Sequence, residues 1–233
     1  MKHVLLTRYA MRFAEDNPRR RYEDRSSWLD YRLKLFHRYT LPSVQAQTFK
    51  DFDWWLLLDP TFPGILEHEP FLQKHAKICW LGADWKEAQV EVGEVLSEQY
   101  KNEWVCSTRL DSDDVISTNF MRNLHDTAEE TESWISFPNG YMMKNNSVVN
   151  RTYLVNPFVS YVEYADPFKS VFSICHTKVD KQEAPLLINS ERSWIQVDHN
   201  DNIKNLVSKK IGNFEDKCYS ANAVRNKFTW DDK

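Results

Sequence analysis

Apolar segments of strand length alternate with amphipathic helical patterns through the first half of the chain, and this alternation constrains the fold most. Residues 54–58 are apolar at every position, which indicates a strand covered on both faces, as in a parallel sheet. We expect strands at residues 3–7, 54–58, 76–80 and 103–110, and helices at residues 28–39, 65–75 and 84–100. This order predicts an α/β fold with a mostly parallel central sheet flanked by helices.

Local signals suggest where several of these elements begin and end. Pro42 is expected to end the first helix, and Ser117 to cap a helix with an apolar face that includes Phe120 and Leu124. The Arg-rich segment 12–25 shows no periodicity and is expected to be a loop. Beyond Trp134 the pattern weakens into short strand-like pieces at residues 134–137, 152–155 and 170–174, which predicts a less regular C-terminal half.

The length and charge of the chain limit the number of domains that it can form and the kinds of partner that it can bind. With 233 residues, 42% of them hydrophobic, the chain can form one domain over residues 1–233. A formal charge of -4 provides no basic field for nucleic acid, and acidic residues surround the three arginines at 19–21. No apolar run has the length of a membrane span or of a secretory signal, so the expected location is the cytoplasm, with peripheral membrane contact left open.

An acidic run, Leu110-Asp111-Ser112-Asp113-Asp114, ends the fourth predicted strand. Ligands of open α/β sheets gather at the carboxyl ends of strands, where Asp59 is also expected. If the backbone is extended, Asp111 and Asp113 point to the same side of one cleft, while Asp114 anchors the loop. Crowded carboxylates need a proton, a cationic partner or a divalent cation such as Mg²⁺ or Mn²⁺. Arg109, just before the run, is a candidate to assist in binding.

The acidic run could also have a purely structural role. The plainest such role is a solvated turn that caps the next helix. An EF-hand is disfavoured because Ile116 stands where the sharp turn of that loop needs glycine. Phosphate binding by a glycine-rich loop is equally disfavoured, since only five glycines occur in the chain and no such motif is present.

Several segments together resemble glycosyltransferases of the GT-A type, and more closely the rhamnosyltransferase family. Residues 41–52 (LPSVQAQTFKDF) resemble the helix-to-strand segment that precedes the second strand in family-2 glycosyltransferases. Residues 108–114 (TRLDSDD) resemble the rhamnosyltransferase form of the D-x-D motif. Residues 156–163 and 194–200 are similar to later blocks. The resemblance implies a GT-A-like nucleotide-binding fold and metal-dependent, inverting transfer of a sugar, with rhamnose a candidate. The donor would be a nucleotide-sugar, and the acceptor a saccharide, a glycan or another hydroxyl compound.

The resemblance also implies roles for individual residues. Thr7, Arg8 and Asp59 would contact the base or ribose of the donor, and Asp111 would lie near the ribose. Asp113 would bind the metal, and His199 matches the late histidine that completes the metal site in many such enzymes. An imidazole ligand shifts the preference from Mg²⁺ towards Mn²⁺. His176 is a weaker competitor.

An inverting transferase needs a carboxylate that accepts the proton of the acceptor hydroxyl. Glu163 is the candidate because it lies in one of the matching blocks, with Asp166 behind it. Residues 1–115 would then form the half that binds the nucleotide-sugar, and residues 116–233 the half that binds the acceptor.

Two different classes of function remain as alternatives. A sugar nucleotidyltransferase, or another Mg/Mn-dependent nucleotide enzyme, would use a similar scaffold, but a glycine-rich loop is expected after its first strand, where this chain has Thr7-Arg8-Tyr9-Ala10-Met11-Arg12. A carbohydrate-binding protein could keep the fold without turnover, and the intact Asp111 and Asp113 count against that alternative.

Overall fold

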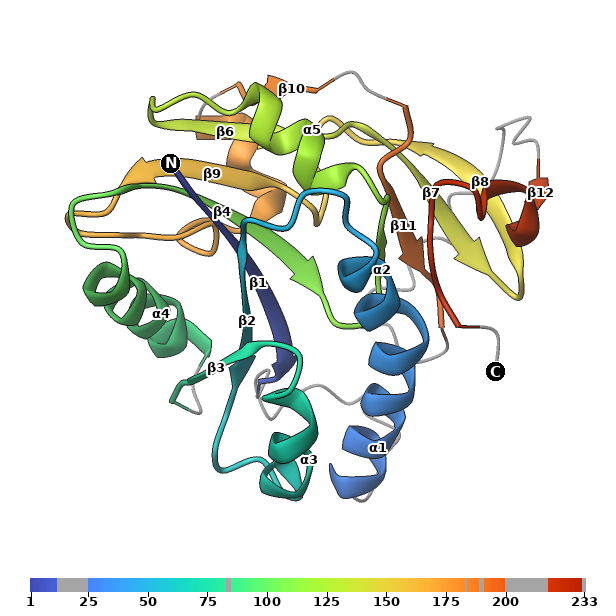
Figure 1. The fold of residues 1–233 in the computed structure, drawn as a ribbon, viewed down its shortest axis with the longest axis horizontal. Helices are drawn as coiled ribbons and strands as arrows, with labels where there is room; N and C mark the ends of the chain where they lie inside the picture. The colour runs from blue at the N-terminus through green and yellow to red at the C-terminus, as the bar shows by residue number, and fades with distance from the viewer. Residues whose placement is uncertain (12–24, 83–84, 183, 189–190, 200–217, 232–233) are drawn as a thin grey trace.

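The computed structural model describes residues 1–11, 25–82, 85–182, 184–188, 191–199 and 218–231. Nearly all of the loop predicted over residues 12–25 lies outside these ranges. The described chain forms two β-sheets, with helices packed on both faces of the larger one (Figure 1). None of the helices in these ranges is long and apolar enough to cross a membrane.

The larger sheet has seven strands in the order β10-β6-β9-β4-β1-β2-β3. Among these seven, β9 alone runs against its neighbours, because it pairs antiparallel with both β4 and β6 while the other pairings are parallel. The α/β class and the mostly parallel sheet are therefore confirmed. The strands are β1 (Lys2–Ala10), β2 (Asp53–Leu58), β3 (Lys77–Trp80), β4 (Trp104–Asp111), β6 (Ser133–Ser136), β9 (Ser160–Tyr164) and β10 (Leu186–Leu187).

Each central strand is buried on both faces, which explains its continuous apolar sequence. Leu5 of β1 packs into one hydrophobic core and its neighbours Val4 and Leu6 into the other, as the alternation of side chains in a strand requires. One face is covered by α1 (Arg25–Leu35), the π-helical turn η1 (Phe36–Thr40), α2 (Leu41–Gln45), α3 (Ile65–Leu72) and α5 (Phe120–Thr127), and the opposite face by α4 (Trp85–Gln99).

The first helical segment corrects one expectation from the sequence. Helical backbone continues from α1 through η1 into α2 and ends at Gln45, so Pro42 does not end it. Pro42 lies in the first turn of α2, where its fixed φ fits a helix. The expectation was wrong because a proline signals a break only when the helix interior needs its N–H group.

The smaller sheet has five strands in the order β12-β8-β7-β11-β5. These strands are β5 (Val115–Ile116), β7 (Asn139–Lys144), β8 (Ser147–Thr152), β11 (Trp194–Val197) and β12 (Cys218–Ser220), and the remaining short elements are η2 (His176–Lys178), α6 (Val179–Gln182) and η3 (Ala221–Val224). Because β5 follows the acidic run directly, this sheet joins the site to the C-terminal part of the chain.

Three expectations for the second half were wrong. The segments 152–155 and 170–174 are not strands: β8 ends at Thr152, and a turn links the amide of Ser173 to the carbonyl of Ser170 at 3.0 Å. Ser117 does not cap α5, since Asn119 precedes that helix and Ser117 instead forms a bridge with Phe228. The strand expected at residues 134–137 is confirmed as β6 (Ser133–Ser136).

The two halves of the chain share the larger sheet. β1 to β4 come from the first half, while β6, β9 and β10 from the second half extend the same sheet beyond β4. The division of labour between a donor half and an acceptor half stays a prediction.

Candidate active site at the carboxyl end of the central strands

The acidic run lies at the point where the order of the strands reverses. The chain proceeds from β1 outward to β2 and β3, and then returns to place β4 on the other side of β1. In open α/β sheets ligands bind in the crevice outside the carboxyl ends of the strands at such a point. Arg8 of β1 and Asp111 of β4 are register partners there and flank the reversal directly.

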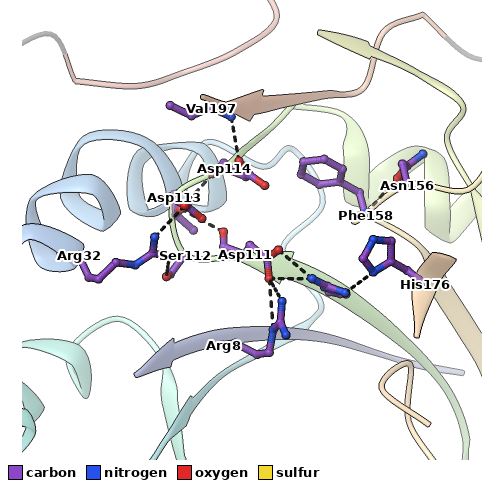
Figure 2. Close-up of polar contacts among 12 residues, drawn as sticks. Arg8, Arg32, Asp111, Ser112, Asp113, Asp114, Asn156, Phe158, His176 and Val197 are labelled. Atoms are coloured by element: carbon purple, nitrogen blue, oxygen red, sulfur yellow. Dashed lines mark hydrogen bonds and ion pairs between the residues drawn. The ribbon is translucent and has the colours of Figure 1, made fainter. Parts of the chain in front are cut away.

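Two arginines hold the carboxylate of Asp111. Nη2 of Arg8 donates to its Oδ1 at 2.7 Å, and Nη2 of Arg109 donates to its Oδ2 at 2.9 Å (Figure 2). Arg109 and Asp111 are two positions apart on β4 and therefore share one face of the sheet. Burial alone would raise the pKa of Asp111, but the guanidiniums of Arg109 and Arg8 outweigh burial and hold it well below its usual range.

Asp113 has a separate pair of partners. Its Oδ2 accepts from Nη1 of Arg32 on α1 at 2.7 Å (Figure 2). The same oxygen lies 2.6 Å from Nε2 of His199. Burial again raises the pKa, but Arg32 and His199 together hold the pKa of Asp113 well below its usual range. The extended backbone expected from Asp111 to Asp113 was wrong, because the strand ends at Asp111 and the chain turns at Ser112. The two carboxylates bind different side chains, and a shared cleft for them stays a prediction.

Asp114 anchors the loop, as the sequence suggested. Its buried Oδ1 accepts the backbone N–H of Val197 at 2.9 Å, and its carbonyl accepts the hydroxyl of Thr40 at 3.0 Å. Burial, together with the neighbouring Asp113 and Asp111, raises its pKa.

Pairing between β5 and β11 brings His199 to the acidic run. The two strands are antiparallel, with Val115 opposite Ile195, so the chain after β11 passes alongside the turn at Asp113. His199 and Asp113 are 86 positions apart in sequence, and this register together with the contact between Asp114 and Val197 places their side chains within hydrogen-bonding distance.

Asp113 and His199 are the pair of residues that could hold a divalent cation. Metal–ligand bonds of about 2.1 Å to a carboxylate oxygen and an imidazole nitrogen put neighbouring ligand atoms roughly 3 Å apart, close to the 2.6 Å between Oδ2 and Nε2 here. Within the described ranges, no three His, Cys, Asp or Glu side chains form a group that could hold a metal ion. The described residues would therefore contribute two ligands, with phosphate oxygens and water completing the shell.

A comparison with protein-family models shows to which family the chain belongs. A family model described as "Putative rhamnosyl transferase" matches residues 5–210. The chain belongs to this family. The acidic run, the three arginines and His199 all lie within the matched segment of this family member. No curated protein matches the chain.

Solved structures that are similar to this family member match it with TM-scores below 0.5 and with low sequence identity. S. aureus TarS, residues 1–349, is 11% identical with a TM-score of 0.47, and the match covers 84% of this chain but 60% of that one. A putative nucleotide-diphospho-sugar transferase from Desulfovibrio desulfuricans G20 is 11% identical with a TM-score of 0.44, covering 97% and 94%. A 4-diphosphocytidyl-2C-methyl-D-erythritol synthase is 14% identical with a TM-score of 0.42, covering 86% and 91%.

Two residues that were expected to contact the donor form hydrogen bonds with other residues of the protein. The buried hydroxyl of Thr7 accepts the indole N–H of Trp54 at 3.0 Å, so its side chain belongs to the core and not to the site. Asp59 does lie at the carboxyl end of β2, where its buried Oδ1 accepts the amide and the hydroxyl of Thr61. It shapes the turn after β2, and a contact with the donor remains a prediction.

The structure does not bring Glu163 to the acidic run. Glu163 is the register partner of Val105, six residues before Asp111 on β4, which is roughly 20 Å along a strand. Its carboxylate accepts the backbone N–H groups of Lys169 and Ser170, both at 2.7 Å. Burial raises its pKa to about 7. Asp166 follows β9 at the same distant end and is exposed. The expectation that Glu163 or Asp166 acts as the base at this site was therefore wrong.

Arg32 and Phe172 carry no signal in the sequence that assigns them to the site, and the sequence offered His176 only as a weaker candidate for the metal. Arg32 binds Asp113 and, through Nη2, the hydroxyl of Ser112 at 2.6 Å. His176 lies 2.6 Å from Nη1 of Arg109 and so belongs to the cluster at Asp111, not to the metal pair. The guanidinium of Arg8 lies over the ring of Phe172, 5.7 Å from its centroid. Each of these residues is defined by a contact between distant segments, which no local pattern distinguishes.

A large open groove lies away from the acidic run. It has a volume of about 910 Å³ and lies beside the edge strand β3, lined by residues that include Phe52, Lys77 and Trp80. None of its lining residues belongs to the acidic run. At the run itself the side chains of Arg8, Arg32 and Arg109 are 10–14% exposed and form ion pairs with Asp111 or Asp113.

Proposed function

We propose that this chain is a metal-dependent glycosyltransferase that moves a sugar from a nucleotide-sugar donor to a hydroxyl acceptor. The proposal rests on the contact between Asp113 and His199. This contact lies where the order of the strands reverses, which is the place where open α/β sheets bind nucleotides. Membership in the rhamnosyl transferase family supports the reaction class and makes rhamnose the first sugar to test.

The residues of the site have different roles in donor binding. Asp113 and His199 would hold Mn²⁺ or Mg²⁺, which as a Lewis acid stabilises the negative charge on a leaving diphosphate. Arg8 and Arg109 present guanidinium groups whose planar geometry suits phosphate oxygens. Asp111, held between them, has acceptor capacity left for a ribose hydroxyl, because a carboxylate offers about four lone-pair positions.

The same arrangement supports an electrostatic mechanism of leaving-group departure. Asp111 holds the guanidiniums of Arg8 and Arg109 in place before the donor arrives, so these two groups would need little reorganisation as charge develops on the diphosphate. Inversion at the sugar carbon is part of the proposal, with a base that is neither Glu163 nor Asp166 because both lie at the far end of β4.

Substitution of Asp113 tests the metal mechanism. In a screen of nucleotide-sugars with and without Mn²⁺, we expect the wild type to hydrolyse or transfer one donor only when metal is present. Asp113→Asn should lose that turnover and keep its thermal unfolding temperature within a few degrees. Asp126→Asn, an exposed carboxylate on α5, is the matched control.

Two results would count against the proposal. Equal turnover in EDTA, or full activity of Asp113→Asn, would exclude a metal held by Asp113. Saccharide binding without turnover of any donor would favour the non-catalytic alternative. Formation of a nucleotide-sugar from a sugar phosphate would favour the nucleotidyltransferase. NMR of the product anomer tests inversion.

A further inference from the structure

Arg32 occupies the carboxylate that the proposed metal needs. Its Nη1 donates to Oδ2 of Asp113 at 2.7 Å, and its Nη2 donates to the hydroxyl of Ser112 at 2.6 Å, so both arms of the guanidinium bind the turn (Figure 2). The same Oδ2 is the atom that lies 2.6 Å from His199. Arg32 and the metal therefore compete for one oxygen.

Charge and burial make this competition strong. The side chains of Arg32 and Asp113 are both 13% exposed, so water screens the interaction poorly. A divalent ion at Oδ2 would lie a few ångströms from a guanidinium that is bonded to the same oxygen, and the two cations would repel one another. The metal can take its place only if Arg32 leaves Asp113 or if an anion comes between them.

The surroundings of Arg32 give it a defined position. Its guanidinium lies 5.7 Å over the ring of Trp28, one helical turn earlier on α1, and that ring packs on Phe62 at 5.1 Å. Arg32 therefore extends from a packed helix face and reaches the turn with its charged end. A diphosphate bound beside Asp113 would offer the same fork-shaped group a partner with several acceptor oxygens.

We propose that Arg32 couples metal binding to donor binding by exchanging Asp113 for the diphosphate of the donor. Without nucleotide, Arg32 neutralises Asp113 and opposes the metal. When a nucleoside diphosphate arrives with the metal, the guanidinium turns to the phosphate oxygens and releases Oδ2. The inference rests on the proposed metal-dependent function and adds to it that metal and nucleotide bind cooperatively.

The test measures Mn²⁺ affinity by electron paramagnetic resonance, without nucleotide and with saturating UDP, GDP or dTDP. In the wild type we expect weak Mn²⁺ binding that tightens at least tenfold with the nucleotide that fits. Arg32→Met should bind Mn²⁺ alone at least tenfold more tightly than the wild type, lose most of the coupling, and bind the nucleotide more weakly. Lys34→Met, an exposed position on the same helix, removes the same charge and should change neither quantity.

The possible outcomes distinguish a failure of this inference from a failure of the proposed metal-dependent function. Unchanged or weaker binding of Mn²⁺ alone to Arg32→Met, with Asp113→Asn abolishing Mn²⁺ binding, would overturn the exchange while leaving the metal site in place. Equal gains in Arg32→Met and Lys34→Met would reduce the effect to overall charge and also overturn it. Absence of Mn²⁺ binding to the wild type under every condition would overturn both proposals.

Discussion

Replacing Asp111 with asparagine removes the charge that two poorly exposed guanidiniums share. The side chains of Arg8 and Arg109 are 14% and 10% exposed, and both donate to this carboxylate. Removing one partner of a buried ion pair costs about 3–5 kcal/mol. Asparagine keeps one acceptor oxygen and Asp111 is itself 24% exposed, so we expect the lower end, about 3 kcal/mol.

For a domain of this size that loss lowers the unfolding temperature by roughly 6–12 °C. Circular dichroism during heating at pH 7 measures it, and urea unfolding gives the free energy directly. The pKa of Asp111 is held below its usual value, so its stabilisation is present above about pH 4 and is lost as the pH falls through the folded value. The difference between the wild type and Asp111→Asn should therefore shrink when both are measured at pH 3.

A double-mutant cycle tests whether the loss of stability in Asp111→Asn comes from its interaction with the guanidiniums. If Asp111 compensates the charge of Arg8, then Arg8→Met combined with Asp111→Asn should cost less than the sum of the single changes by about 1–2 kcal/mol. A loss below about 1 kcal/mol for Asp111→Asn, together with an additive cycle, would refute the view that the pair is a tightly coupled, poorly hydrated cluster.

Three further substitutions test the placement of individual residues. Glu163→Gln should gain stability relative to the wild type as the pH rises from 5 to 8, by up to about 3 kcal/mol. The reason is that Glu163 has a pKa of about 7 in the folded state and ionises near 4.5 in the unfolded state, so ionisation favours unfolding of the wild type. Urea midpoints that differ between the two proteins by the same amount at both pH values would contradict this, and turnover per folded molecule should not change. Thr7→Val leaves the indole N–H of Trp54 buried without its acceptor and should cost about 1–3 kcal/mol in urea unfolding, while a large loss of donor affinity would instead restore Thr7 to the donor site. Asp114→Ala releases the amide of Val197 and should weaken Mn²⁺ binding roughly 10- to 100-fold through His199, whereas Asp114→Asn keeps an acceptor oxygen and should lose far less in the same titration.

Local signals along the chain are enough to predict the class of fold and the position of the acidic run. Continuous apolar segments at β1, β2 and β4 and amphipathic patterns at α3 and α4 are such signals, because periodicity reports which faces are buried. The run at the end of β4 can be placed at the carboxyl edge of the sheet for the same reason. Family resemblance pairs Asp113 with His199, and the two side chains do lie in contact.

Only the tertiary structure decides which arginine pairs with which carboxylate. It also decides which carboxylates lie near the site. Arg32 reaches Asp113 across 81 positions, and no local pattern marks it. Glu163 fails as a base because β9 runs antiparallel to β4, which carries it to the end of the strand opposite Asp111. Strand direction and pairing are set by packing between distant segments, which a linear pattern does not encode.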